Sequence, residues 1–211
     1  MNFNIKLSIK RVLVLSVFVS FSISGCNGQK GPTEYATFAG GCFWCTEEMF
    51  ERVEGVVKAV SGYAGGEKVN PTYKEVSMGK TNHAEVIQVQ YNTSEISYNQ
   101  LLEMFFYAHD PTQLNKQMPD IGTQYRSAIY YHNDAQKELA YNYLKELQKS
   151  GDRGYPIVTE LKPLDKFYKA EEYHQDFVEK NPGQSYVVSV ARPKIEKFVK
   201  RFKEYLKPAY K

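Results

Sequence analysis

The chain contains few cysteines: three among 211 residues, at positions 26, 42 and 45. Three cysteines cannot supply the several bridges of a small disulfide-stapled protein. No second cysteine pair stands at ligand spacing, and the four histidines are dispersed. The sequence therefore predicts neither a structural zinc site nor any other bound metal.

An excess of either charge is also missing from most of the chain. The formal net charge of +3 comes from Lys6, Lys10 and Arg11, because the first 25 residues contain no acid. From residue 26 onward acidic and basic side chains balance, which gives no electrostatic reason to expect nucleic acid as a partner.

The N-terminal segment is typical of a targeting signal. A basic start leads into an apolar run from Val12 to Ile23, which is too short to span a bilayer. The run ends in "ISGC", which resembles the lipobox of bacterial lipoproteins, where cleavage before the cysteine leaves Cys26 as the lipid-bearing N-terminus. An ordinary signal peptide and a short uncleaved anchor are the alternatives.

These features predict three parts: a lipoprotein signal peptide over residues 1–25, a tether over residues 26–34 and one folded domain over residues 35–211. The lipid would hold the domain on a membrane of the bacterial cell envelope, facing outside the cytoplasm.

Hydrophobic periodicity and turn residues predict alternating strands and helices in the folded domain. Strands are expected over residues 35–41, 55–66, 84–91, 127–132 and 155–164, and helices over residues 42–53, 97–109, 133–151, 170–181 and 192–207. The first six elements follow the order βαββαβ. The sequence therefore predicts an α+β protein with a ferredoxin-like βαββαβ core and an additional C-terminal strand and helices.

The stretch "AGGCFWC" lies where the first strand passes into the first helix. Cys42 would then occupy the first helical turn, where free backbone amides and the helix dipole favour an anion. A thiolate there has a lowered pKa and is a nucleophile near neutral pH. The alternative is a buried, unreactive thiol, as most free cysteines are.

A carboxylate stands on the more apolar face of a predicted strand. In "AEVIQVQY", period-two alternation places Glu85 on the same side as Ile87, Val89 and Tyr91. A buried, unpaired carboxylate holds its proton and can then donate it. Glu85 could also reach solvent or pair with a lysine.

Longer motifs resemble those of one family, the A-type peptide methionine sulfoxide reductases, which return one epimer of methionine sulfoxide to methionine. The matching segments stand in the family's order over roughly residues 35–190: "GGCFWC", "GYAGG", "NPTYKEV", "NHAEV", "HDPTQLNKQMPDIGTQYRSAIY" and "AEEYHQDF".

The resemblance implies a role for each matching residue. Cys42 would attack the sulfoxide sulfur and become a sulfenic acid, while Glu85 would protonate the oxygen. Tyr73 and Tyr125 would hydrogen-bond that oxygen, and Asp120 would organise this polar side. Phe43 and Trp44 would form the wall that receives the substrate's methyl group, and that arrangement suits a single epimer, the S form.

The family resemblance also implies the other reactants: free methionine sulfoxide or oxidised proteins and peptides as substrate, and an external, thioredoxin-like thiol as reductant. The chain departs from family members that carry resolving cysteines in a C-terminal tail, since its last cysteine is Cys45. Cys45 is therefore the candidate resolving thiol.

Two other classes of function fit part of the sequence. A C-x-x-C pair between a strand and a helix also occurs in thioredoxin-like disulfide oxidoreductases, but the Glu85 and Tyr125 segments would then have no role. The third class is a surface lipoprotein that binds peptides in an aromatic groove without catalysis.

Overall fold

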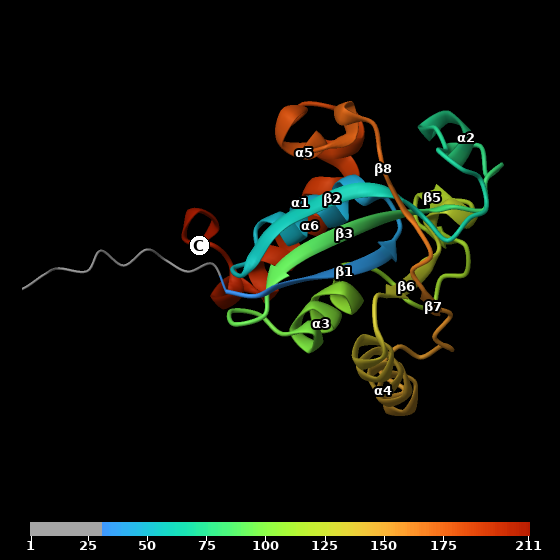
Figure 1. Ribbon diagram of the computed structural model, residues 1–211. Coiled ribbons are helices and arrows are strands. Elements are labelled where there is room, and N and C mark those ends of the chain that lie inside the picture. Colours follow the sequence, from blue (N-terminus) through green and yellow to red (C-terminus); the bar gives the residue numbers. More distant parts are fainter. Residues whose placement is uncertain (1–30) are drawn as a thin grey trace, which may run out of the picture.

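The structure is a computed structural model that describes residues 31–211 (Figure 1). The predicted signal peptide and Cys26 lie outside the described residues. Within residues 31–211, no helix combines the length and the apolar character that a membrane span requires.

The centre of the fold is a six-stranded sheet with strand order β7-β6-β1-β3-β2-β8. Its strands are β1 (Thr33–Gly40), β2 (Val56–Ala64), β3 (Ala84–Asn92), β6 (Ser127–Tyr131), β7 (Glu160–Pro163) and β8 (Phe167–Lys169). All neighbours pair antiparallel except β6 and β7, which are parallel. The inner strands β6-β1-β3-β2 have the ferredoxin-like arrangement, so the predicted α+β core is confirmed.

Six α-helices and a short hairpin complete the described chain. The helices are α1 (Phe43–Glu51), α2 (Tyr73–Ser77), α3 (Tyr98–Ala108), α4 (Asp134–Ser150), α5 (Phe177–Lys180) and α6 (Arg192–Arg201), and the hairpin pairs β4 (Lys116–Gln117) with β5 (Asp120–Ile121). Ser97 caps α3 with a reciprocal capping box, Asn133 caps α4, and Gly151 ends α4 in the left-handed conformation.

Two features of the C-terminal third differ from the sequence prediction. The single helix predicted over residues 170–181 is wrong: the segment forms a 3₁₀ turn at Glu172–His174 and then α5. Asp176, at φ +55°, interrupts the helical path between them. The last helix ends at Arg201 rather than at residue 207, and the short strand β8 has no counterpart among the predicted elements.

The sheet buries apolar side chains on both faces. On β3, Ile87, Val89 and Tyr91 belong to the main core, and α1, α3 and α6 contribute to the same cluster. Val86 belongs to a smaller cluster of alanines and Tyr130. Figure 1 shows α1 and α6 lying together along the sheet. This packing fixes the N-terminal end of α1 against β3, where Glu85 lies.

Candidate active site

The strand-to-helix junction places Cys42 at the start of α1. Gly41 has φ +89°, a conformation that other residues rarely adopt, and a Cβ at this position would stand 2.7 Å from the Gln117 side chain. Cys42 follows as the residue that caps α1, and Cys45 lies three residues later in the first turn.

A small cavity of about 130 Å³ opens beside Cys42. It is lined by Cys42, Phe43, Trp44, Tyr73, Glu85, Asp120, Tyr125 and Tyr186. The structure thus brings together every residue that the sequence predicted for the substrate side of the site, and it adds Tyr186. Cys45 does not line this cavity, and Cys26 lies outside the described residues.

Glu85 is a buried member of the cavity lining, with 2% of its surface exposed. Its Oε2 accepts a hydrogen bond from the backbone N–H of Phe43 at 3.1 Å, so the carboxyl group meets the N-terminus of α1. Burial raises the pKa of Glu85 well above its ordinary value, and the nearby Cys42 and Asp120 add to the effect. A neutral carboxylic acid next to the thiol is therefore the favoured state.

The two cysteines are both buried and free. The expected lowering of the Cys42 pKa is wrong for the enzyme without substrate: burial, followed by the hydrogen bond and charge of Cys45, raises it. The main physical reason is burial of the thiol; in addition, the first free amide of α1, that of Phe43, bonds to Glu85. The hydrogen bond from Cys42 lowers the pKa of Cys45.

Hydroxyl groups and one acid form the polar side of the cavity. Burial raises the pKa of Tyr73 to about 12 and raises that of Tyr125 as well, so both keep their protons as donors. The Tyr186 hydroxyl donates to Asp120 Oδ2 at 2.5 Å and also reaches the Cys42 thiol.

The apolar side is built on Trp44. Its ring stacks on Phe177 with centroids 3.8 Å apart, and its indole N–H donates to His174 Nδ1 at 3.0 Å. His174 also packs against Phe43 and Tyr73. These contacts hold Phe43 and Trp44 as a rigid wall opposite the hydroxyl groups.

Several of these supporting residues were not assigned a role from the sequence. Glu171 accepts hydrogen bonds from the Tyr73 backbone and from the Tyr63 hydroxyl, both at 2.8 Å, and so positions the Tyr73 segment. Glu171, His174 and Phe177 all belong to "AEEYHQDF", one of the segments that carry the family resemblance. The motif alone did not predict which residues these side chains contact. Nothing in the sequence pattern pointed to Tyr186.

The arrangement can carry out one kind of chemistry. A buried sulfur nucleophile faces a proton donor and three hydroxyls, and an apolar wall closes the opposite side. A small group with an acceptor oxygen on one side and a methyl group on the other fits both surfaces. Among residues 31–211, no group of three or more His, Cys, Asp or Glu side chains is placed to hold a metal ion.

Comparison with known proteins gives a consistent result. A family model described as peptide methionine sulfoxide reductase matches residues 34–206. The chain is 52% identical over 172 residues to peptide methionine sulfoxide reductase MsrA of Natronomonas pharaonis, covering 82% of this chain and 97% of that protein. It is 48% identical over 174 residues to MsrA of Acinetobacter baumannii strain SDF, covering 82% and 98%.

Solved structures agree with these matches. The reduced form of Mxr1 from Saccharomyces cerevisiae superposes with a TM-score of 0.65 at 42% identity, covering 72% of this chain and 87% of that one. Methionine sulfoxide reductase A of Corynebacterium diphtheriae superposes with a TM-score of 0.64 at 39% identity, covering 74% and 77%.

Proposed function

The chain belongs to the peptide methionine sulfoxide reductase family and reduces methionine sulfoxide, and we propose that Cys42 is the nucleophile of this reaction. The observation that carries the proposal is the cavity in which Cys42 and Glu85 stand together, between hydroxyl donors and an aromatic wall. A thioredoxin-like disulfide oxidoreductase, the alternative function, would not need this cavity.

The substrate sulfoxide lies with its oxygen toward Tyr73, Tyr125 and Glu85 and its methyl group against Phe43 and Trp44. Asp120, held by Tyr186, organises the polar side. Exchanging the oxygen and the methyl group would place a polar atom against an apolar wall, which is costly. The pocket therefore selects one epimer, the S form by family.

In the first step, the Cys42 sulfur attacks the sulfoxide sulfur and forms a bond to it while Glu85 protonates the oxygen. The high pKa of Glu85 keeps the acid protonated until the oxygen arrives. The hydroxyl group then passes from the substrate sulfur to Cys42, the sulfur–sulfur bond breaks and methionine leaves. The proton of the Cys42 thiol returns Glu85 to its acid form, and Cys42 ends as a sulfenic acid. Sulfur is reduced in the substrate and oxidised in the enzyme, so the first turnover needs no external reductant.

In the second step, Cys45 attacks the sulfenic acid, water leaves and a Cys42–Cys45 disulfide forms. Residues three apart at a helix start lie about 5 to 6 Å apart between Cα atoms, within disulfide range. Support comes from the placement of both thiols at the start of α1 and from the lack of another cysteine within residues 31–211. A thioredoxin-like or smaller external thiol then reduces the disulfide.

The N-terminal segment adds the cellular setting. Cleavage before Cys26 and lipidation of that cysteine would tether the catalytic domain to a membrane outside the cytoplasm. Support comes from the basic start, the short apolar run and the "ISGC" sequence. Such an enzyme would repair methionine in oxidised proteins of the cell envelope.

A Cys45→Ser variant separates the two steps. With a methionine sulfoxide peptide and no reductant, it should still release about one equivalent of methionine per enzyme, because Cys42 acts alone there. It should then stall as a sulfenic acid when thioredoxin, which attacks disulfides, is the only reductant. Normal turnover with thioredoxin would show that Cys45 does not resolve the intermediate, whereas a failed first turnover would place Cys45 in the chemical step.

A further inference from the structure

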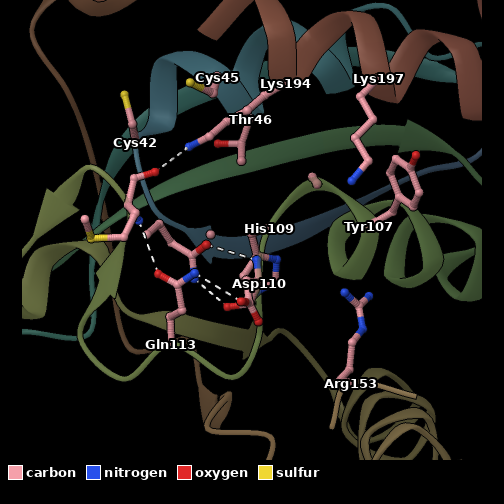
Figure 2. A pocket seen from close by; sticks show the side chains of 14 residues that line it. Cys42, Cys45, Thr46, Tyr107, His109, Asp110, Gln113, Arg153, Lys194 and Lys197 are labelled. Atoms are coloured by element: carbon pink, nitrogen blue, oxygen red, sulfur yellow. Dashed lines mark hydrogen bonds between the residues drawn. The ribbon is translucent and has the colours of Figure 1, made fainter. Parts of the chain in front are cut away.

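A second, larger cavity of about 350 Å³ lies on the other side of the cysteine pair (Figure 2). Cys45 borders this cavity and not the small one, whereas Cys42 borders both. The two sulfurs therefore lie between the small cavity, which fits the sulfoxide, and the larger cavity, which has no role in sulfoxide reduction.

Three cations line the second cavity: Arg153, Lys194 and Lys197. Figure 2 shows Lys194 extending past Cys45, while Lys197 and Arg153 enter the same space from α6 and from the loop after α4. Arg153 and Lys194 are half-buried, so their charges are screened less than those of a free surface side chain.

The cavity contains fewer acids than cations. Within residues 31–211, none of the three cations forms an ion pair. Asp110 is the one acid of the lining; the charge of Arg153 acts on it, and its carboxylate accepts hydrogen bonds from Thr112 and Gln113. The remaining basic groups contact neutral partners: Lys194 reaches the Met118 carbonyl at 3.5 Å, and Lys197 lies over the Tyr107 ring.

We propose that this cavity binds a low-molecular-weight thiol that bears carboxylate groups, and that this thiol reduces the enzyme's Cys42–Cys45 disulfide. The inference rests on the proposed function, because it requires that disulfide. The cations would hold the carboxylates of the reductant, and the cavity wall would direct its sulfur toward the disulfide.

The exchange balances as two thiolate attacks. In the first, the bound thiolate forms a bond to Cys42 Sγ, which also borders this cavity, the Cys42–Cys45 bond breaks, and Cys45 leaves as a thiolate, whose charge Lys194 favours. In the second, another thiolate attacks the ligand sulfur of the mixed disulfide and releases Cys42. Two thiols are oxidised to one disulfide, and both cysteines are reduced.

The size and position of the cavity favour a small molecule as the reductant. Its volume is at the lower end of the range for small-ligand pockets, about 300 to 1,000 Å³. Cys42 and Cys45 are only 8% and 4% exposed, so a broad protein surface would meet their sulfurs poorly, whereas a small thiol can enter beside them.

The test uses three small thiols that differ in charge: 3-mercaptopropionate, 2-mercaptoethanol and cysteamine. The enzyme is first oxidised by one turnover with a methionine sulfoxide peptide, and disulfide formation is confirmed by mass spectrometry. The rate of disulfide reduction is then measured for each thiol and divided by the rate at which the same thiol reduces a small uncharged disulfide, which removes differences in thiol pKa and intrinsic nucleophilicity. We expect 3-mercaptopropionate to react fastest and cysteamine slowest, with the difference shrinking as salt is added.

Three variants locate the effect: Lys194→Gln, Lys197→Gln and Arg153→Gln. Each should lower the ratio of the 3-mercaptopropionate rate to the 2-mercaptoethanol rate, by about threefold to fivefold for a partly screened charge pair. Lys200→Gln is the matched control, since Lys200 is exposed on the same helix and does not line the cavity. The control should leave the ratio unchanged.

Equal rates for the three thiols, or ratios that the cavity variants leave unchanged, would overturn the inference while leaving the proposed function intact. Variants that slow disulfide reduction by thioredoxin but not by 3-mercaptopropionate would overturn the inference and indicate that a protein partner binds this surface. A first turnover that releases no methionine, or that leaves no disulfide, contradicts the proposed function itself, and the inference is then rejected with it.

Discussion

The Glu85→Gln variant tests the proton donor of the chemical step. Glutamine keeps the shape of the side chain, and its Oε1 can still accept the hydrogen bond that Glu85 accepts from the Phe43 amide at 3.1 Å. The fold and the helix start should therefore persist. The substitution removes only the acidic proton, which the buried carboxyl group transfers to the sulfoxide oxygen.

The size of the effect follows from that role. General acid catalysis contributes typically about 10²- to 10⁴-fold, so the rate of the first turnover should fall by about 10²-fold or more. A 10²-fold loss corresponds to about 2.7 kcal/mol of transition-state stabilisation. Substrate binding should change far less, because Tyr73 and Tyr125 still contact the oxygen and Trp44 still contacts the methyl group.

The assay is methionine release in a single turnover without reductant, followed across pH at saturating and limiting peptide. Because the folded-state pKa of Glu85 is raised, the acid is protonated below that pKa, and the rate should fall as the pH rises through it. Glu85→Gln should lack this falling limb. The exposed Glu54→Gln variant is the control. A Glu85→Gln rate and pH profile matching the parent enzyme would refute the argument and leave Glu85 with a structural role.

Two further predictions concern other parts of the chain. Burial raises the pKa of Glu47 from 4.5 to about 7, so its stabilising contribution is complete below about pH 4.5 and is lost as the pH rises through 7; the loss amounts to about 3 kcal/mol. Urea unfolding at low and high pH measures how the free energy of unfolding depends on pH. The parent and the exposed control Glu138→Gln should lose stability as the pH rises, and Glu47→Gln should not. The same loss in Glu47→Gln would exclude Glu47 as its source. Cys26→Ala should release the protein from membranes without changing the catalytic rate, as measured by fractionation, and an unmodified Cys26 in the mass spectrum of the native protein would reject the lipid anchor.

The core of the fold, Cys42 and Glu85 were predictable because they leave local patterns. The roles of the other site residues, Tyr73, Tyr125, Asp120, Phe43 and Trp44, were implied only by the family resemblance. Alternation along β3 placed Glu85 on the side of Ile87 and Val89, and that is the face of the main core. Glycines before Cys42 predicted the strand-to-helix junction. The caps at Ser97 and Asn133 gave the starts of α3 and α4.

The rest depends on contacts between distant segments. The predicted helix over residues 170–181 had the right composition, but Gln175 bonds to Ser61 on β2 and Asp176 takes the left-handed conformation. The lowered pKa expected for Cys42 rested on the helix start alone. That expectation was wrong because burial by the surrounding segments raises the pKa of the thiol, while the Phe43 amide bonds to Glu85, 42 residues away in sequence.

The position of Tyr186 was beyond prediction for the same reason. Its hydroxyl meets Asp120 across 66 residues of sequence, and no periodic or turn pattern encodes that contact. The basic cavity likewise forms only when α6 and the loop after α4 approach the same end of α1.

The central claim is that Cys42 accepts the sulfoxide oxygen, and a reductant-free single turnover tests it directly. The parent enzyme, mixed with excess methionine sulfoxide peptide, should release about one equivalent of methionine and lose both free thiols to a disulfide. Cys42→Ser should fold normally and release none. Methionine release by Cys42→Ser at the parent's level would contradict the account.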